Sequence, residues 1–492
     1  MHNKRNFISA IICQIITMIS GLILPRLIIA TFGSEINGLV SSITQFLGFI
    51  AVLEGGLGAV VLSELYKPIE CRDDSTIKGI LSECQNFFSK LSIIFVGYTF
   101  LLILIFPWIT KSDNSFFYNG SLILILSFTT IIRYLFSITN RLYLQANQKV
   151  YIVNNVTSIL TVVNLVVAYL VICIYPEIHL LKIMADIAFL IQPIMFKHYV
   201  EKRFRVKISL KKRDNHYLKN RWSGFSQNLA HYINMNTDIV IITLFLGFKA
   251  VSVYTVYMLA INALRSLVSL LSNSYQSALG KYYAQGDTEN LLNHYSKFDT
   301  LNLQISVIAF NTCLLLINPF VSLYTDGIND ANYYQPIFAS IIVFANMLYS
   351  IREPKRYMIL SAGKFKETNF GAIMEAVINI SLSLLLVYHF GLIGIAIGTL
   401  VAITYRHIYF INYLNKDLLL ISFKHYLAPT VIALIICASN YYIYHLDLIV
   451  IDSVSEFLIN GFLLVLVESI ITFILFKIML ITQKALSNRR DK

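Results

Sequence analysis

Four ionisable side chains lie within long apolar stretches of this sequence: Arg26, Glu54, Asp238 and Arg265. A charge in the middle of a membrane helix costs about 2.5 to 3.5 kcal/mol on insertion scales, so it usually faces a partner or a cavity. The planar guanidinium of arginine binds an anionic phosphate through charge-assisted hydrogen bonds. A carboxylate in the same setting can carry a proton or a sodium ion. We therefore expect the two arginines to bind an anionic group and the two carboxylates to couple to an ion.

Internal salt bridges are the alternative explanation for these four charges. Arg26 could pair with Asp238, and Glu54 with Arg265, and each pair would then serve only the assembly of the helices. Arg26 also lies near the end of its apolar segment, from which a long side chain can reach the membrane surface.

Three amide side chains, Gln45, Asn236 and Asn262, occur in the same helical hairpins as these charges. Amides can hydrogen-bond the hydroxyls of a sugar, and they also join neighbouring helices within a membrane. We predict that the three amides contact the substrate, with helix–helix contacts as the alternative.

Further charges occur in other apolar segments, and three of them, Arg352, Glu353 and Arg356, bracket Pro354 within about one helical turn. Proline frees a backbone carbonyl one turn earlier, so we expect a kinked helix whose freed carbonyl needs a partner. The preferred interpretation of these three charges is a helix near the inner membrane surface with solvated side chains. The rest of this set comprises Arg133, Asp186, Glu375, Arg406 and Glu468. Glu468 is interpreted as a contact within the helical bundle.

No set of catalytic residues is visible in the sequence. The motifs GxSxG, HExxH and phosphate-binding GxxxxGK(S/T) are absent, as is an aspartate-rich metal motif. The six cysteines show neither a disulfide framework nor the spacing of zinc ligands. We therefore expect no catalytic residue, cofactor or metal site, and a protein that is not an enzyme.

The composition indicates a protein of the lipid bilayer. Of the 492 residues, 57% are hydrophobic and 13% are charged, and the mean hydropathy is +0.66. A soluble domain carries about 25% charged residues, and one soluble core could not bury so much apolar surface. Alternating strand patterns are absent, so we predict an all-α membrane protein.

Fourteen apolar segments are long enough to cross the bilayer as helices, which need roughly 20 residues each. An even number puts both termini on one side of the membrane. The connections on the opposite side carry only Lys111, Lys182 and Lys249 as basic residues, so the positive-inside rule predicts that both termini are cytoplasmic. The segments span about 7–32, 36–62, 87–110, 116–144, 150–175, 178–199, 223–247, 250–280, 298–324, 333–360, 365–390, 391–414, 425–446 and 455–480.

The two halves of the chain resemble each other. The polar residues Ser34–Asn37 predict the tight turn of a helical hairpin, and Gly33 before them falls on Gly247 at a shift of 214 residues. Pro107 falls on Pro319 at a shift of 212. Parallel repeats are typical of transporters, whose ligand site lies between the halves. We predict four parts: an N-terminal six-helix bundle over 1–200, a basic cytoplasmic linker over 201–222, a second six-helix bundle over 223–414, and two appended helices with a cytoplasmic tail over 415–492.

The most basic run, residues 201–222, has aromatic residues between its lysines and arginines, and the whole chain has a net charge of +12. Such a mixture can bind nucleic acid. Here membrane helices flank the run, so membrane orientation and attraction to anionic lipid headgroups explain it better. We expect membrane lipids as a partner and no nucleic acid.

The sequence is similar to a known family. The stretch FGSEINGLVSSITQFLGFIAVLEGGLG, followed by LSELYKP, resembles the start of bacterial polysaccharide flippases of the Wzx type. TDIVIITLFLG with VYTVY in the second half, and LSAGKFK at 360–366, fit the same family. These flippases belong to the multidrug/oligosaccharidyl-lipid/polysaccharide exporter (MOP) superfamily. The related lipid II flippases carry an Arg-Asp pair in helix 1, whereas Leu27 follows Arg26 here, so no substrate residue is carried over from them.

The resemblance implies two six-helix bundles in a V-shaped, MATE-like arrangement, plus two C-terminal helices, with alternating access between the bundles. It implies a flippase of the bacterial cytoplasmic membrane. The substrate would be an undecaprenyl-diphosphate-linked oligosaccharide repeat unit for capsule, O-antigen or exopolysaccharide synthesis. H⁺ or Na⁺ would be the coupling ion, and a polysaccharide polymerase would be a partner. The alternatives are a drug/cation antiporter of the same superfamily and a membrane polysaccharide polymerase or ligase, for which the short external connections leave little room.

Overall fold

The computed structural model describes residues 2–54, 57–110, 114–204, 225–364, 366–419, 430, 433, 435–442, 451 and 453–488. Within these residues the chain forms helices and connections, with no β-strand. Ten of the helices in this part are long and apolar enough to cross a membrane, which confirms the predicted all-α membrane class. Most of the predicted segment 425–446 and of the basic run 201–222 lies outside the described residues.

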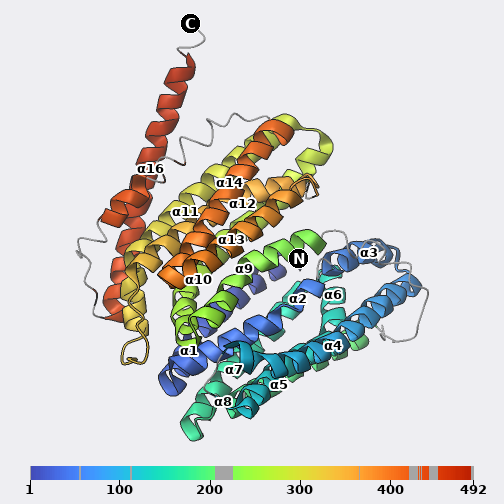
Figure 1. Ribbon diagram of the computed structural model, residues 1–492. Coiled ribbons are helices and arrows are strands. Elements are labelled where there is room, and N and C mark those ends of the chain that lie inside the picture. The colour runs from blue at the N-terminus through green and yellow to red at the C-terminus, as the bar shows by residue number, and fades with distance from the viewer. Residues whose placement is uncertain are drawn as a thin grey trace. The chain divides into compact units, whose positions relative to one another are not determined.

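The chain divides into two compact units, of which unit 1 comprises Met1–Tyr232 and Leu246–Ser252. Within this unit the first helix lies along the seventh, and the seventh along the eighth (Figure 1). One π-helical turn, η1, interrupts the rod formed by α5 and α6. The elements are α1 (His2–Gly48), α2 (Ala51–Glu54), α3 (Leu57–Cys71), α4 (Asp74–Thr110), α5 (Phe116–Ile132), η1 (Arg133–Ser137), α6 (Ile138–Ala146), α7 (Val150–Ile174) and α8 (Ile178–Phe204).

Unit 2 comprises Ile233–Phe245 and Val253–Lys492. The helices that fall wholly or largely in it are α9 (Phe225–Phe245), α10 (Phe248–Gln285), α11 (Thr288–Tyr324), α12 (Pro336–Ser361), α13 (Asn369–Phe390), α14 (Leu392–Tyr413), the π turn η2 (Leu414–Leu418) and α16 (Val454–Asn488). Helices α11 to α14 pack side by side, and α16 lies along α11 (Figure 1). The four-part division over 1–200, 201–222, 223–414 and 415–492 stays a prediction.

The number of helices is roughly consistent with the fourteen predicted membrane-spanning segments. Segments 7–32 and 36–62 fall on α1, α2 and α3, because α1 runs through both sides of the expected hairpin turn. Helix α12 matches segment 333–360 but is absent from the ten apolar spans, and it carries four charged residues close together, at 352, 353, 355 and 356.

Glycine marks the same break in both halves of the chain. Gly33 has φ 83° and ψ 171° between two helical stretches of α1, and Gly247 has φ 80° between α9 and α10. A side chain strongly disfavours this left-handed region, whereas glycine enters it freely. The predicted turn over Ser34–Asn37 is therefore wrong in detail: Gly33 alone breaks the helix, and residues 34–37 already belong to the next helical stretch.

The repeat extends to the starts of α4 and α11. Asp73 accepts hydrogen bonds from the backbone N–H groups of Ser75 and Thr76, and Asp287 likewise accepts from the N–H of Asn290. The hydrogen bonds from Thr76 hold the pKa of Asp73 below its usual value. Each aspartate thus caps a helix N-terminus, which satisfies amide groups that have no partner within the helix.

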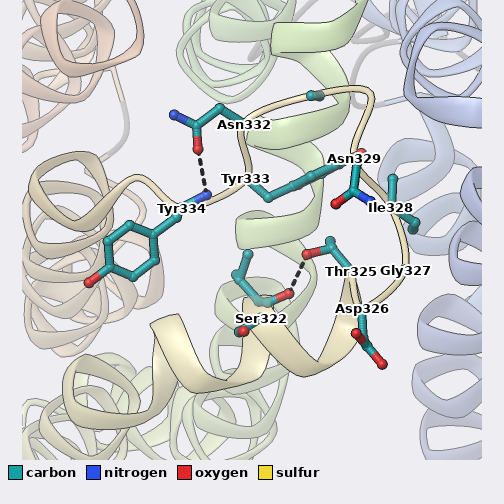
Figure 2. A pocket seen from close by; sticks show the side chains of 11 residues that line it. Ser322, Thr325, Asp326, Gly327, Ile328, Asn329, Asn332, Tyr333 and Tyr334 are labelled. Atoms are coloured by element: carbon teal, nitrogen blue, oxygen red, sulfur yellow. Dashed lines mark hydrogen bonds between the residues drawn. The ribbon is translucent and has the colours of Figure 1, made fainter.

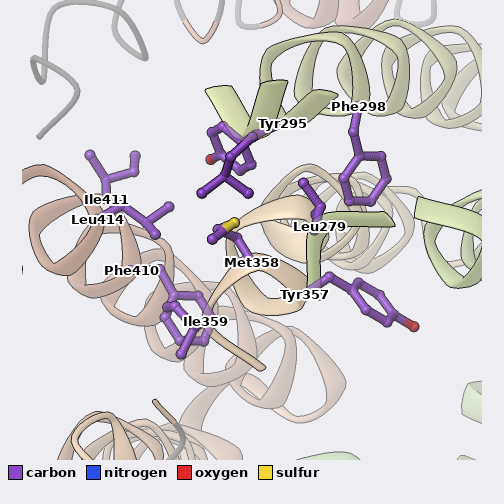
Figure 3. Close-up of a cluster of buried hydrophobic side chains, with 10 residues drawn as sticks. Leu279, Tyr295, Phe298, Tyr357, Met358, Ile359, Phe410, Ile411 and Leu414 are labelled. Carbon is purple, nitrogen blue, oxygen red and sulfur yellow. The ribbon is translucent and has the colours of Figure 1, made fainter. Parts of the chain in front are cut away.

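A cluster of apolar side chains holds one end of unit 2 together. Tyr295 and Phe298 of α11, Met358 of α12 and Phe410 of α14 are buried in it (Figure 3). The ring of Phe298 stacks on Tyr275 of α10 with centroids 4.7 Å apart and an interplanar angle of 9°. Because Met358 follows the charged part of α12 directly, this packing fixes the position of those charges.

Gly38 of α1 offers a test of helix packing within unit 1. A Cβ atom there would lie 1.8 Å from the carbonyl oxygen of Phe248, whereas one on Gly21 of the same helix would meet nothing within 4 Å. Gly38→Ala is expected to destabilise the protein by about 1–3 kcal/mol through overpacking. Gly21→Ala is expected to be neutral or slightly stabilising. The apparent melting temperatures of the purified variants measure both, and equal values would contradict the close approach at Gly38.

Candidate functional site

Asp238 of α9 is a buried carboxylate surrounded by neutral polar groups. It is 5% exposed. Its Oδ2 accepts hydrogen bonds from Tyr254 Oη at 3.0 Å and from Thr399 Oγ1 at 3.1 Å. Asn379 Nδ2 in turn donates to Thr399 Oγ1 at 3.1 Å. Within the described part of unit 2 Asp238 forms no ion pair, and its alternative pairing with Arg26, a residue of unit 1, stays a prediction.

Three buried oxygen atoms of α9 and α13 have no hydrogen-bond partner among the described residues: Asp238 Oδ1, Asn379 Oδ1 and Ser383 Oγ. Asn379 and Ser383 are fully buried and lie four residues apart, on one face of α13. Helix α14 approaches closely, since a Cβ on Gly398 would lie 2.4 Å from Ser383 Oγ. We call Asp238, Asn379, Ser383 and Thr399 the oxygen cluster.

The oxygen cluster suits a singly charged cation or a proton. It offers one negative charge and several neutral oxygen atoms, and burying an uncompensated carboxylate is costly. A divalent metal usually demands more carboxylate or imidazole ligands. No group of three or more His, Cys, Asp or Glu that could hold a metal occurs in the described part of the chain. The expectation that Asp238 couples to an ion stays a prediction, and the geometry is compatible with it.

Arg265 of α10 lies against α12. Its Nη1 donates to Asn346 Oδ1 at 3.4 Å, and its guanidinium carbon lies 4.0 Å from the ring centroid of Tyr349. The guanidinium of Arg352 lies over the same ring at 4.5 Å. A cation is attracted to the negative face of an aromatic ring, so Tyr349 stabilises both charges. The alternative pairing of Arg265 with Glu54 would join residues of different units and stays a prediction.

The charges of α12 are paired and all but the half-buried Arg356 are buried, so the preferred interpretation of a solvated helix is wrong. Arg352 is 3% exposed and binds Glu375 of α13. Arg406 Nε of α14 lies 3.7 Å from the other oxygen of Glu375, and Arg406 Nη1 donates to the carbonyl of Thr368 at 2.9 Å. Carboxylates on neighbouring helices thus take the place of the water that would solvate these charges at a surface.

Two more ion pairs complete this layer. Arg356 donates to both oxygens of Glu353, at 2.9 and 2.7 Å, and Lys355 binds Asp299 of α11. Bidentate pairing of this kind is among the strongest side-chain hydrogen bonding in proteins. We call the charged residues of α12 with Asp299, Glu375 and Arg406 the ionic layer.

Pro354 leaves the carbonyl of Ser350 without its helical donor, as the sequence predicts. Asn302 of α11 replaces that donor: its Nδ2 donates to Ser350 O at 2.7 Å. Helix α12 therefore continues without interruption from Pro336 to Ser361. The donor on a distant helix could not be identified from the sequence, because only the fold brings residue 302 to residue 350.

In unit 1 Glu54 interacts with two arginines of its own unit, Arg133 and Arg141. Helix geometry alone would separate these arginines by about 80° around the helix axis. The extra residue of the π turn η1 reduces this to about 20°, so both lie on nearly one face. The predicted role of Glu54 in ion coupling stays a prediction.

The other predicted residues fall on helices of both units. Arg26 and Gln45 lie half-buried on α1, and Asn236 lies half-buried on α9. Asn262 is exposed on α10 and lies three residues before Arg265, so the two share a helix face. Their joint contact with one substrate stays a prediction.

The remaining charges have local partners. Asp186 of α8 accepts a hydrogen bond from Thr129 of α5. Asn440 donates to Glu468 of α16 at 2.6 Å, which confirms the interpretation of Glu468 as a contact within the bundle.

A polar hollow of about 290 Å³ lies in the connection between α11 and α12 (Figure 2). Asp326, Asn329, Asn332 and Tyr334 are among the residues that line it. Tyr257 fixes this connection, since its hydroxyl donates to the carbonyl of residue 333 at 2.8 Å and accepts from the N–H of residue 335 at 3.0 Å. No arginine, lysine, histidine or cysteine is among the described residues that line the hollow.

Comparison with known proteins identifies the fold. No protein-family model and no curated protein sequence matches the chain. A structure of lipid II flippase MurJ in an inward closed conformation matches with a TM-score of 0.71 and 16% identity, over 97% of this chain and 99% of that chain. An outward-facing MATE multidrug transporter of the MOP superfamily gives a TM-score of 0.59 and 14% identity, over 83% and 93%. A MOP superfamily transporter from Pyrococcus furiosus gives a TM-score of 0.59 and 16% identity, over 85% and 96%. The chain therefore has the fold shared by MurJ and MATE transporters, and all three neighbours are flippases or transporters.

Asn302 offers a test of the hydrogen bond to the carbonyl that Pro354 leaves without a helical donor. Asn302→Ala leaves the buried carbonyl of Ser350 unpaired, at a cost of about 1–3 kcal/mol. Asn311 is the matched control, because it is also a buried amide of α11 but makes no hydrogen bond within the described residues. Asn302→Ala is expected to lower the apparent melting temperature more than Asn311→Ala does. The opposite order would show that Asn302 contributes only its volume.

Proposed function

We propose that this chain is a flippase that moves undecaprenyl-diphosphate-linked oligosaccharide repeat units across the bacterial cytoplasmic membrane, for capsule, O-antigen or exopolysaccharide synthesis. The observation that carries the proposal is the match to a lipid II flippase along nearly the whole length of both chains. The sequence resemblance to polysaccharide flippases favours a lipid-linked oligosaccharide as the cargo. Both termini would be cytoplasmic, as the distribution of basic residues predicts.

Arg26 and Arg265 are the proposed ligands of the diphosphate, each within its own unit. Arg265 reaches the ring of Tyr349 and the amide of Asn346. A guanidinium within membrane helices suits an anionic headgroup. Asn262, on the same helix face, would contact a sugar hydroxyl.

Ion coupling is proposed at the oxygen cluster. One bound Na⁺, or one proton on Asp238, would cancel the buried negative charge and draw α9, α13 and α14 together around it. The chain's own part is to hold the oxygen atoms, with Thr399 and Asn379 orienting the carboxylate through hydrogen bonds. The export of lipid-linked units would then depend on the gradient of that ion.

A drug/cation antiporter is the second candidate. The MATE neighbours support it, and so does a buried acid without an ion pair in the described part of the chain. The ionic layer and Arg265 weigh against a site built for cations, because the guanidiniums of Arg265 and Arg352 both lie over the ring of Tyr349.

A strain that lacks the protein tests the flippase proposal and the role of the arginines together. It is complemented with wild type, Arg26→Ala, Arg265→Ala or the control Arg5→Ala, in which the exposed Arg5 near the start of α1 is changed. Lipid-linked units on the outer leaflet are measured by access of an external sugar-binding probe. Loss of a charge-assisted hydrogen bond is expected to lower outer-leaflet units about tenfold in the two site variants.

In the deletion strain, complete units are expected to accumulate on the cytoplasmic leaflet, without surface polymer. Units that reach the outer leaflet there and stay unpolymerised would refute the flippase proposal and point to the polymerase alternative. Normal export by a folded Arg26→Ala protein would remove the role assigned to Arg26.

Sodium binding is tested by the thermal stability of the purified protein. A ligand that binds only the folded state raises the free energy of unfolding by RT ln(1 + [L]/Kd), and the apparent melting temperature rises with it. Sodium chloride, compared with choline chloride, is expected to raise it for wild type and for the control Asp326→Asn, which alters an exposed acid of the α11–α12 connection. Asp238→Asn is expected to lose the rise. A rise that persists in Asp238→Asn would place the ion elsewhere, and a response to pH alone would assign a proton.

A further inference from the structure

We propose that Tyr349 is a positioning residue for Arg265, and that the ion pair between Arg352 and Glu375 ties this position to the oxygen cluster. The inference rests on the proposed function and deepens it, because it says how ion binding would reach the residue that binds the diphosphate. All of these residues belong to unit 2.

The Arg265 guanidinium is held at two points of α12. Tyr349 supplies its ring face at 4.0 Å. Asn346, three residues earlier on the same side of the helix, supplies its amide oxygen at 3.4 Å. The amide of Asn346 is itself oriented, because its Nδ2 donates to the carbonyl of Ile342 at 2.8 Å, which leaves Oδ1 for Arg265. A guanidinium fixed in this way loses less conformational freedom when it binds an anion.

Tyr349 also connects Arg265 to the ionic layer. The guanidinium of Arg352 lies over the same ring at 4.5 Å. Two positive charges this close repel each other, and the ring, together with the carboxylate of Glu375, offsets that repulsion. The position of Arg265 therefore depends on where Glu375 holds Arg352.

Helix α13 carries both Glu375 and a member of the oxygen cluster. Asn379 follows Glu375 by four residues, about one turn, so both side chains leave α13 on the same face. On α14, Arg406 follows Thr399 by seven residues, about two turns, and Arg406 lies 3.7 Å from the Glu375 carboxylate. Helices α13 and α14 thus each carry residues of the oxygen cluster and, one to two turns further along the helix, residues of the ionic layer.

A displacement of α13 or α14 when a cation binds would therefore move Glu375 and Arg406 together. Arg352 would follow, because separating it from Glu375 leaves buried charges without a partner. A movement of Arg352 would shift the ring of Tyr349 beneath it, and with that ring the guanidinium of Arg265. A purely structural ionic layer would stabilise the helices but would leave anion binding at Arg265 unchanged, and this difference can be measured.

The first experiment measures the affinity of the purified full-length protein for undecaprenyl diphosphate. Tyr349→Leu is expected to weaken binding about tenfold, and Tyr349→Phe, which keeps the ring face, to stay within twofold of wild type. Tyr357→Leu is the matched control, because Tyr357 is also a buried tyrosine of α12 under a guanidinium, that of Arg356 at 4.4 Å. Combining Tyr349→Leu with Arg265→Ala is expected to weaken binding no further than Arg265→Ala alone.

The second experiment repeats the binding measurement with sodium chloride and with choline chloride. Sodium is expected to tighten binding of undecaprenyl diphosphate to wild type severalfold, and this effect is expected to vanish in Glu375→Gln. Glu375→Asp, which keeps the charge on a shorter side chain, is expected to retain part of the effect and serves if Glu375→Gln does not fold. The sodium-dependent rise in melting temperature is expected to persist in both variants, because the oxygen cluster is intact.

The outcomes separate the two proposals. If Arg265→Ala binds undecaprenyl diphosphate as tightly as wild type, the diphosphate site of the proposed function fails. If Arg265→Ala weakens binding but Tyr349→Leu matches Tyr357→Leu, only the positioning role is overturned. A sodium effect that survives in Glu375→Gln, or is absent from wild type, would overturn the connection to the oxygen cluster.

Discussion

The cost of placing charge in the low-dielectric interior of a membrane constrains unit 2 more than any other interaction. Arg352, Lys355, Arg356 and Arg406 all lie on membrane-length helices, and each has a carboxylate within ion-pair distance. Breaking such a pair leaves an uncompensated buried charge, which is far more costly than the pair itself is stabilising. The arrangement of α11 to α14 therefore depends on keeping these partners together.

Asp238 and Arg265 of unit 2 have neutral groups among their partners. Asp238 is bound by a phenol and a hydroxyl, and Arg265 is bound by an aromatic ring and an amide. Neutral partners orient a charge without cancelling it. Asp238 is thus a buried negative charge with neutral partners, the kind of group that a bound cation or a proton would stabilise.

Several features could be predicted from the sequence because they depend on local chemistry. Apolar segments of spanning length gave the helices, the matched glycines at 33 and 247 marked the same break in both halves, and Asp238 stood out as an acid in an apolar segment. A freed carbonyl before Pro354 was also predictable, because proline always removes that hydrogen bond.

The partners of these residues could not be predicted. Asn379 and Ser383 are ordinary polar residues in the sequence, and only the packing of α13 against α14 brings them to Asp238. The charges around Pro354 looked like a solvated surface, because nothing local shows that Asp299 and Glu375 cover them. Pairing across helices is decided by tertiary packing, on which hydropathy and residue type carry no information.

The hydrogen bond from Asn302 to the carbonyl of Ser350 has a consequence for the way this protein can change over evolutionary time. A side chain of α11 supplies the hydrogen bond that α12 lacks before its proline, so the curvature of α12 depends on α11. A sequence that loses the proline regains its own helical donor and no longer needs the amide. Positions 302 and 354, 52 residues apart, are therefore expected to be substituted together, as a linked pair rather than as two independent sites.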